Sequence, residues 1–294
     1  MANAAFGTET QPTTMPNAGP GYEAKYAYSE TLTGPEYHCH DFYEFYIHIR
    51  GGQRYGMYER LFQLRPNQLF IIPPFVMHGL SYDDVLRGYE RAYVNVTTEM
   101  VNRLGFGKFD LDGFFRSYTS KGNYAFQLSA LDAEACVSYV KRIQESTPSD
   151  DPADGFAGCC ALAGFLSTVC QTMRMSSSVI GDDIPSSVIQ NVLAYINGHY
   201  TQTLKMEDIA RRFGISVSYL SHEFTKFTKR SVYEYILYRR VMLAKQMMSG
   251  DMSLNQIAYQ CGFGDYSNFL RMFNKLVGMS PSQYRKQIRL PQDG

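Results

Sequence analysis

The sequence predicts an α+β protein of two domains, a β-barrel or sandwich with flanking helices followed by an all-α domain. Three observations support this fold class. Short β-rich runs separated by turn residues fill the first hundred residues, and a helical unit occurs twice near the C-terminus. Charge is also divided: residues 1–185 hold 14 Lys and Arg against 21 Asp and Glu, and residues 186–294 hold 14 against 7. A basic half beside an acidic half suits a nucleic-acid-binding domain joined to a domain with another task.

The composition indicates a cytoplasmic protein without a membrane partner. The 294 residues are enough for two domains. Residues 1–21 lack the basic start and apolar core of a secretory signal, and their Thr, Pro, Asn and Gly content predicts a disordered arm. No apolar run of the sequence reaches the ~18 residues of a membrane span. No C-x-x-C pair occurs, so reduced, mostly buried thiols are expected at Cys39, Cys136, Cys159, Cys160, Cys170 and Cys261.

The region from Tyr22 to about Val96 is predicted to be β structure. Its runs are rich in aromatic and β-branched residues, and Gly51-Gly52, Pro66-Asn67 and Pro73-Pro74 interrupt them. Strands are expected at residues 42–49, 53–58, 60–64, 68–72 and 88–96. Many short strands with turns between them favour a sandwich or a small barrel.

A polar constellation lies within this β region at His38, His40, Glu44 and His78. Residues two apart in a strand face the same side, so these side chains could converge inside a barrel, with Cys39 on the opposite side. Imidazoles and a carboxylate suit Zn, Mn, Fe or Ni. The same groups could instead hydrogen-bond a sugar or another polar effector, or line a barrel mouth without a ligand. Further candidate pocket residues are Tyr46, Arg54, Tyr58 and Tyr93.

Two helices and a linker are predicted to follow the barrel. A helix over residues 131–145 has Ser129 as its cap and Asp132 at the third position of a capping box. A more apolar helix over residues 156–175 follows a loop at 150–155, while residues 109–124 give no clear period. These helices could pack on the barrel, form a dimer contact, or do both. The Ser, Gly, Asp and Pro content of residues 176–185 predicts a linker between domains at 22–175 and 186–294.

The C-terminal repeat predicts two helix-turn-helix units, at about 204–228 and 253–277. The offset between the copies is 48 residues, and it is 49 from Leu220 onward. Matching positions are Ile209 and Ile257, Gly214 and Gly262, Leu220 and Phe269, Phe224 and Phe273, and Tyr235 and Tyr284. Each copy has a short helix, a Gly turn and a second helix, which in such motifs can enter a DNA major groove.

Capping residues and spacers complete this prediction. Thr203, Ser216 and Asp265 stand where N-caps are expected. An opening helix begins after Ser186, and a long helix over residues 232–248 should hold the two units at a fixed separation. Successive major-groove turns on one face of DNA, about 34 Å apart, would then be within reach.

The run GFGDYSNFLRMFNKLVGMSPSQYR at 262–285 resembles the signature of the AraC/XylS family of bacterial transcription regulators. The run IARRFGISVSYLSHEFTKFTKRSVYEYI at 209–236 resembles the other half of that family's DNA-binding domain. The His and Glu constellation is similar to the metal motif of the cupin barrel and to the ligand-sensing domain of many AraC-like regulators, although Pro74 to His78 lacks the Gly that cupins often carry.

The resemblance implies a transcriptional activator controlled by a small-molecule effector, such as a sugar or related metabolite, bound in a cupin-like pocket. The pocket residues would be His38, His40, Glu44, Tyr46, Arg54, His78 and Tyr93, with a divalent metal ion at the His and Glu positions as the one possible cofactor. The implied partners are double-stranded promoter DNA, the effector, RNA polymerase and a second copy of the chain.

The resemblance also implies which residues contact DNA. Ser218, Ser221 and His222 match positions that approach bases or phosphates in family members, and His222 is shorter than the Arg common there, which disfavours a bidentate guanine contact. On the second helix the outward positions are Tyr266, Ser267, Leu270 and Arg271, with Arg271 the leading candidate. Phosphate contacts, or simply solvated surface charges, are expected at Lys226, Lys229, Arg230, Arg239, Arg240, Lys275 and Arg285.

An enzyme is the alternative hypothesis. A metal-dependent cupin dioxygenase or isomerase needs a complete ligand set and an open coordination position. The attached pair of helix-turn-helix units disfavours this function, so no catalytic residue is assigned.

Overall fold

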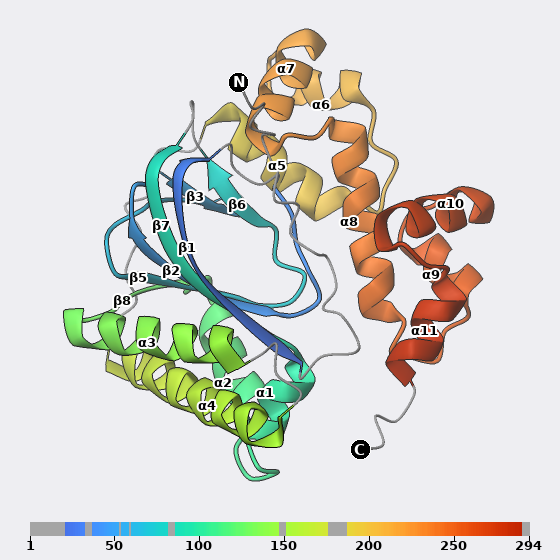
Figure 1. Cartoon of the computed structure of the whole chain (residues 1–294). Coiled ribbons are helices and arrows are strands. Elements are labelled where there is room, and N and C mark those ends of the chain that lie inside the picture. Colours follow the sequence, from blue (N-terminus) through green and yellow to red (C-terminus); the bar gives the residue numbers. More distant parts are fainter. Residues whose placement is uncertain are drawn as a thin grey trace, which may run out of the picture.

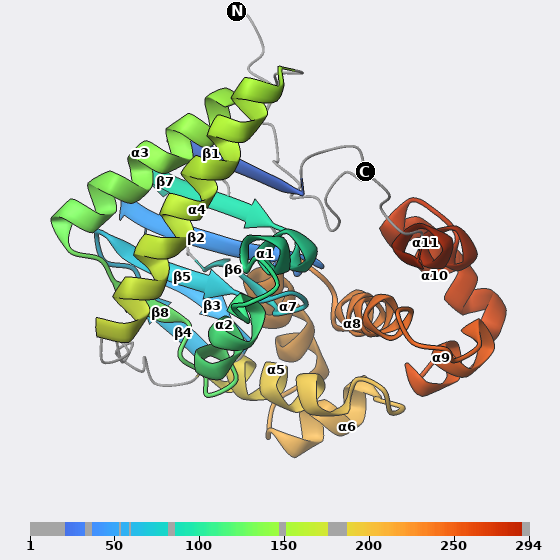
Figure 2. The ribbon, with the colours of Figure 1, turned by 90° about the horizontal axis from the view of Figure 1, so that it is seen from below.

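The computed structural model describes residues 21–32, 37–52, 54–58, 60–81, 86–146, 151–175 and 187–289. A β-rich body has helices on two sides: α1 to α4 cover one face, and α5 to α11 form a second body beside it (Figures 1 and 2). The arm expected at residues 1–21, apart from Gly21, and the linker expected at 176–185 lie outside the described residues.

Two antiparallel sheets form the N-terminal body. The larger has the strand order β1-β7-β2-β5-β8, and the smaller has the order β4-β3-β6. The strands are β1 (Tyr22–Leu32), β2 (Tyr43–Arg50), β3 (Arg54–Met57), β4 (Arg60–Gln63), β5 (Gln68–Ile72), β6 (His78–Ser81), β7 (Leu86–Val96) and β8 (Ala125–Gln127). The predicted β-barrel or sandwich is therefore confirmed, with β1, β6 and β8 as strands beyond the five expected individually.

The central strand β2 is buried on both faces. Phe45 and Ile47 pack outward into a core shared with the helices, whereas Tyr46 packs into a second core between the two sheets. Because side chains alternate along a strand, Glu44 lies on the same inner face as Tyr46. The strand thus places one ionisable side chain inside the β body.

Four helices flank the larger sheet (Figure 2). They are α1 (Thr98–Leu104), α2 (Leu111–Thr119), α3 (Ala130–Ser146) and α4 (Pro152–Met175). The Ser129 hydroxyl accepts from the Asp132 amide at 3.1 Å, as the capping prediction requires. The loop predicted at 150–155 is wrong, because α4 already begins at Pro152, and proline suits the first turn of a helix.

Helix α4 is long and apolar enough, by length and composition alone, to cross a membrane. Within the described chain this helix packs along α3, and 33% of its most apolar 18-residue stretch is buried. Its composition is therefore also that of a helix that packs on a core.

The C-terminal body contains two similar helical units joined by one long helix, α8 (Val232–Met247). The remaining helices are α5 (Val188–His199), α6 (Met206–Arg212), α7 (Val217–Thr228), α9 (Leu254–Gln260), α10 (Tyr266–Val277) and α11 (Pro281–Arg289). Gly214 and Gly262 have φ of 65° and 87°, the left-handed region where glycine is least strained. Ser216 and Asp265 cap α7 and α10 as predicted, but Thr203 does not cap α6, whose N-cap is Lys205.

The two bodies share hydrophobic packing. Tyr37, Cys39 and Met77 of the N-terminal body belong to the same buried cluster as the apolar side chains of α5 to α11. Figure 1 shows α8 running next to the β body, between the two helical units. The chain therefore buries its domain junction in this conformation.

Candidate functional sites

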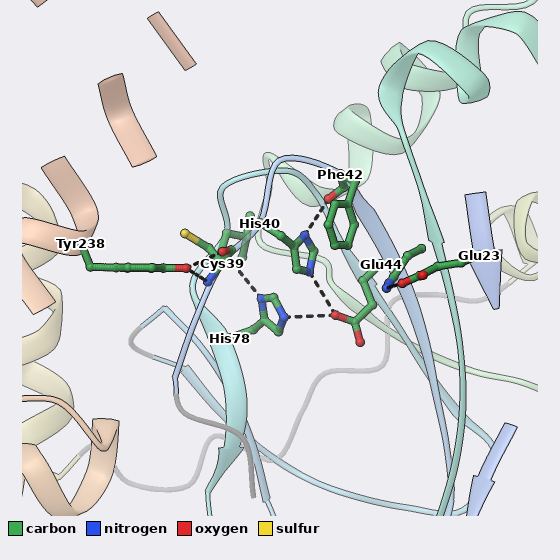
Figure 3. Close-up of polar contacts among 9 residues, drawn as sticks. Glu23, Cys39, His40, Phe42, Glu44, His78 and Tyr238 are labelled. Carbon is green, nitrogen blue, oxygen red and sulfur yellow. Dashed lines mark hydrogen bonds and ion pairs between the residues drawn. The ribbon is translucent and has the colours of Figure 1, made fainter. Parts of the chain in front are cut away.

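The four residues of the polar constellation converge between the sheets. One ligand atom from each of His38, His40, Glu44 and His78 lies within 4.8 Å of the others, and all four residues are buried. Among the described residues they are the only group of three or more His, Cys, Asp or Glu side chains that could share an ion. Figure 3 shows His40 and His78 both pointing at the Glu44 carboxylate.

Three different elements position these side chains. Glu44 is on β2, His78 begins β6, and His38 and His40 are on the segment before β2. The prediction that this segment is a strand is wrong: only His38 forms an isolated bridge, with His78, through backbone bonds of 2.9 and 2.8 Å. The Phe75 amide donates to the His40 carbonyl at 2.7 Å, which holds the segment of His40 against the segment before β6.

The hydrogen bonds of His40 and His78 determine which ring nitrogen faces the centre. Nδ1 of His40 lies 2.9 Å from the Phe42 carbonyl, and Nδ1 of His78 lies 2.8 Å from the Val76 carbonyl. A carbonyl only accepts, so both Nδ1 atoms carry hydrogen. Each Nε2 atom then faces Glu44 Oε2, at 3.1 Å in both cases.

Burial and charge act in opposite directions at this cluster. Burial alone would raise the pKa of Glu44, but the two imidazoles beside it hold that pKa well below its usual range. Burial lowers the pKa of His40 below that of an exposed histidine, although Glu44 acts against this. The carboxylate is therefore ionised, and because both Nδ1 atoms already carry hydrogen, an Nε2 atom donates to Glu44 only when its ring is an imidazolium.

Aromatic side chains extend the buried surface from the cluster. The Tyr55 ring is stacked 6.2 Å from His78, and the Tyr46 ring is stacked 4.9 Å from Tyr55. Tyr46 also shares a hydrogen bond with Tyr89, and Tyr93 pairs with Tyr46 in the ladder of β2 and β7.

Tyr55 and Met57, rather than Arg54, are the β3 residues in the inner core. Alternation along the strand directs Arg54 to the other face, so Arg54 leaves the predicted pocket set. The sequence patterns indicated β3 but gave no signal for Tyr55.

The opposite side of the segment that carries His38 and His40 contacts the helical body. The Cys39 amide donates to Tyr238 Oη at 3.0 Å, and this hydroxyl donates to the Cys39 carbonyl at 2.5 Å (Figure 3). Asp41 Oδ2 lies 2.9 Å from Lys245 Nζ and accepts from Tyr284 Oη at 3.0 Å. Cys39 thus faces away from the histidines, as predicted.

Helix α7 presents the predicted contact residues to solvent. Ser218, Ser221 and His222 are exposed, and Leu220 and Phe224 bury the opposite face. Tyr219 is also exposed, at 47%. Nδ1 of His222 lies 2.9 Å from its neighbour's carboxylate, Glu223 Oε1.

Helix α10 presents fewer of its predicted residues. Ser267 and Arg271 are exposed, whereas Tyr266 and Leu270 are half-buried and pack against the core of the helical body. The Arg271 guanidinium donates to Asn268 Oδ1 at 3.0 Å along its own helix.

The predicted phosphate-contact residues fall into two groups. Lys226, Lys229 and Lys275 are exposed, and Arg285 is half-buried. The prediction is wrong for Arg239, which is buried between the bodies, over the rings of Tyr58 and Tyr200.

Two further arginines hold the helical body together. Arg240 donates to the carbonyls of Tyr200 and Gln202 at 2.7 and 2.8 Å. Arg230 is half-buried, with its guanidinium 4.6 Å from the centroid of the Tyr238 ring. Both side chains therefore have a structural role in this conformation.

Family models match both bodies of the chain. Residues 21–156 match the model of an AraC-like ligand binding domain, and residues 209–287 match that of a helix-turn-helix domain. The first match covers the β body with α1 to α3 and the start of α4, and the second runs from the middle of α6 through most of α11.

Several curated relatives match about a third of the chain. The activator AarP of Providencia stuartii is 33% identical over 101 residues, which are 34% of this chain and 75% of AarP. The uncharacterized regulator YdiP of Escherichia coli is 34% identical over 103 residues, which are 35% of this chain and 34% of YdiP. The chain thus spans about a third of the length of YdiP, and it spans 36% of YijO from the same organism.

Solved structures match different shares of the chain. The DNA-binding domain of AdpA, in complex with a target DNA, is 25% identical with a TM-score of 0.34, and the match covers 36% of this chain and 99% of that one. ToxT from Vibrio cholerae is 14% identical with a TM-score of 0.36, and the match covers 92% of this chain and 98% of ToxT.

Proposed function

Because the chain belongs to the AraC family of helix-turn-helix transcriptional regulators, we propose that it binds promoter DNA through α7 and α10 and activates transcription. The observation that carries this proposal is the pair of helix-turn-helix units joined by α8, each with an exposed second helix. In such motifs the second helix enters the major groove while the first helix supports it. Residues 186–294 are the proposed DNA-binding domain.

Different side chains are proposed for base and phosphate contacts. Arg271 on α10, with Ser267 beside it, and Ser218, Ser221 and His222 on α7 are placed to approach bases. Exposed Lys226 and Lys229 follow on α7 and suit phosphate oxygens, which position a protein without specifying sequence. Tyr266, Leu270 and Arg230 are half-buried, so they would support the interface more than contact bases.

The N-terminal domain, residues 22–175, is the proposed sensor of a small polar effector such as a sugar or related metabolite. Buried His38, His40, Glu44 and His78 supply hydrogen-bonding groups next to the tyrosine rings, as a polar-ligand pocket requires. Tyr46 and Tyr93 belong to the same proposed pocket. The alternative occupant of the four-residue cluster is a divalent metal ion, which the three imidazoles and one carboxylate favour.

We also propose that the chain forms a homodimer and acts in the cytoplasm together with RNA polymerase. The α4 sequence contains no charged residue from Gly155 to Met173, and Phe156 on this helix is 72% exposed. A second copy of the same helix would cover this surface. The metal-dependent enzyme is set aside, because the relatives are transcriptional regulators.

The effect of Arg271→Ala on DNA binding tests the proposed interface. The DNA is a promoter fragment selected for binding to the full chain. If Arg271 contacts a base, the substitution should weaken binding by about 1–3 kcal/mol. If it contacts a phosphate, the slope of log affinity against log salt concentration should fall by about one. Fluorescence anisotropy over a salt series measures both quantities. The matched control is Arg103→Ala, which removes an exposed arginine on α1 of the sensor domain. Equal affinity and salt slope in the two variants would contradict the assignment.

A further inference from the structure

We propose that α7 and α10 select different bases: α7 selects a base with a major-groove amino group, adenine or cytosine, and α10 selects a guanine. This inference rests on the proposed function, because it names what each helix recognises in the DNA. Two observations carry it. The two helices are equivalent residue by residue, and one exposed position has different chemistry in each.

Helices α7 and α10 are the same structural unit, shifted by 49 residues and separated by α8 (Figure 1). Both are 12 residues long, and their N-caps are Ser216 and Asp265. Both end at a C-cap in the left-handed region, Lys229 with φ of 58° and Gly278 with φ of 78°. The shift of 49 residues relates both pairs of caps, so each position of α7 has a counterpart in α10.

The shift matches exposed residues of the same type at two positions. Ser218 corresponds to Ser267 in the first turn, and Lys226 corresponds to Lys275 in the last turn. A serine hydroxyl bonds to several bases, and a lysine ammonium group suits phosphate oxygens. Residues of the same type give the two helices the same preference, so these positions do not make the two units differ in sequence selectivity.

The same shift matches His222 with Arg271, where the chemistry differs. Both side chains are exposed, whereas the equivalent pair Leu220 and Phe269 is fully buried. The Arg271 guanidinium donates to Asn268 Oδ1 at 3.0 Å, and a guanidinium has five N–H donors and no acceptor. Guanine presents two acceptors, O6 and N7, in the major groove, and their bidentate contact with arginine is the commonest specific one. Helix α10 therefore suits guanine.

The imidazole of His222 presents an acceptor instead. Its Nδ1 atom lies 2.9 Å from Glu223 Oε1, and a carboxylate only accepts, so Nδ1 carries the hydrogen. In the neutral ring, Nε2 then has a lone pair and accepts a hydrogen bond. The hydrogen-bond donors that bases offer in the major groove are the N6 amino group of adenine and the N4 amino group of cytosine. Helix α7 therefore suits one of these two bases.

The residue that follows His222 increases this difference. Glu223 occupies the α7 position that Met272 occupies in α10. Its carboxylate places a negative charge beside His222, and this charge is unfavourable next to the O6 and N7 atoms of guanine. The two helices therefore require a DNA site with two unlike segments, about one helical turn apart.

Base analogues that lack one recognised atom test this assignment. The DNA is a promoter fragment selected for binding to the full chain, at about pH 8, where an exposed imidazole is neutral. Each adenine, cytosine and guanine of the two contacted regions is replaced in turn by unsubstituted purine, 2-pyrimidinone or 7-deazaguanine. These analogues lack the adenine amino group, the cytosine amino group and the guanine N7 atom, respectively.

We expect removal of one amino group to weaken binding about two- to tenfold in the wild-type chain and not at all in His222→Ala. Whether the effective analogue is that of adenine or that of cytosine identifies the base. Removal of one guanine N7 atom should weaken binding of the wild-type chain by a similar factor and leave that of Arg271→Ala unchanged. Lys226→Ala is the matched control, since loss of a phosphate contact should weaken binding to all of these fragments alike.

The contradicting outcomes separate this inference from the function on which it rests. Coupling of His222 to a guanine, or to no base, would overturn the assignment of α7, and the absence of a guanine coupled to Arg271 would overturn that of α10. Promoter binding by the full chain would leave the proposed function intact in both cases. Failure of the folded chain to bind any promoter fragment would instead overturn the proposed function itself.

Exchange of the two side chains tests the same claim by a gain of preference. The double variant carries His222→Arg and Arg271→His, both at exposed positions, so circular dichroism should show an unchanged fold. We expect it to prefer, by about fivefold or more, a fragment in which the two recognised base pairs are exchanged. The wild-type chain should prefer the selected fragment. The same preference in both proteins would overturn the inference.

Discussion

His48 is a buried histidine whose protonation is set by its surroundings. It lies on β2 with 2% of its surface exposed, and no hydrogen-bond partner of its Nδ1 is found among the described residues. Burial lowers the pKa of His48 to about 4. The unfolded chain binds this proton near the ordinary pKa of about 6.5, so stability is full above that pH and is lost as the pH falls toward 4.

The His48→Gln variant should therefore change the pH dependence of stability. Between pH 7 and pH 4 the wild-type chain should lose up to about 3 kcal/mol more than the variant. Urea unfolding at a series of pH values measures this difference. A gap between the two proteins that stays constant over the whole range would show that His48 does not titrate in this way.

Single residues were predictable where their role is local. Gly214, Ser216 and Asp265 act within one turn of chain, and the structure places all three as expected. The choice of Arg54 over Tyr55 failed because a four-residue strand has too few alternations to reveal which face is buried. The spacing of the His and Glu residues indicated the cluster. Their convergence was predicted from the alternation of side chains along a strand, but the segment before β2 is not a strand.

At the scale of elements, α4 combines a buried face with an exposed apolar one. Leu162, Phe165 and Val169 are fully buried, whereas Phe156 is largely exposed. An exposed apolar surface of this kind typically marks an interaction site. The helix was predictable from its period, but α2 was not, because aromatic and glycine residues leave residues 109–124 without a clear helical period.

The Phe156→Glu variant tests whether α4 forms the dimer contact. A buried, unpaired carboxylate at a symmetric interface would shift the chain from dimer to monomer, with a dissociation constant raised at least about tenfold. Sedimentation over a concentration series measures this change. Tyr259→Glu is the control, since it charges an equally exposed aromatic residue on α9. The same association state in wild type and both variants would contradict a contact through α4.

At the scale of the whole molecule, the two domains are joined by buried polar contacts that local sequence patterns could not reveal. Cys39 and Tyr238 are about 200 residues apart in the sequence, and so are Asp41 and Lys245. Arg239 illustrates the consequence, because it was expected on the DNA-facing surface and instead lies in this junction. Long-range packing, rather than helical period, decides its position.

Removal of the Asp41 carboxylate should weaken the junction and the fold together. Lys245 is fully buried, so Asp41→Asn leaves its ammonium group without the carboxylate that it faces, at a cost of about 2–3 kcal/mol. Urea unfolding, monitored by tyrosine fluorescence and by circular dichroism, should show one shared transition in the wild-type chain and two separate transitions in the Asp41→Asn variant. A single transition at the wild-type midpoint would show that the ion pair does not hold the domains together.

The central claim is that two helix-turn-helix units, spaced by α8, bind successive turns of one DNA face. The most direct measurement starts from a promoter DNA fragment selected for binding to the full chain. It compares the affinity for this fragment with the affinity for the same fragment carrying an insertion of about five base pairs, half a helical turn, between the two contacted regions. Engagement of both units predicts that the insertion lowers affinity to that of one contacted region alone. Because α8 fixes the separation of the units, about ten extra base pairs, which restore the DNA face but lengthen the span, should not recover the lost affinity. Unchanged affinity after the half-turn insertion would contradict the claim.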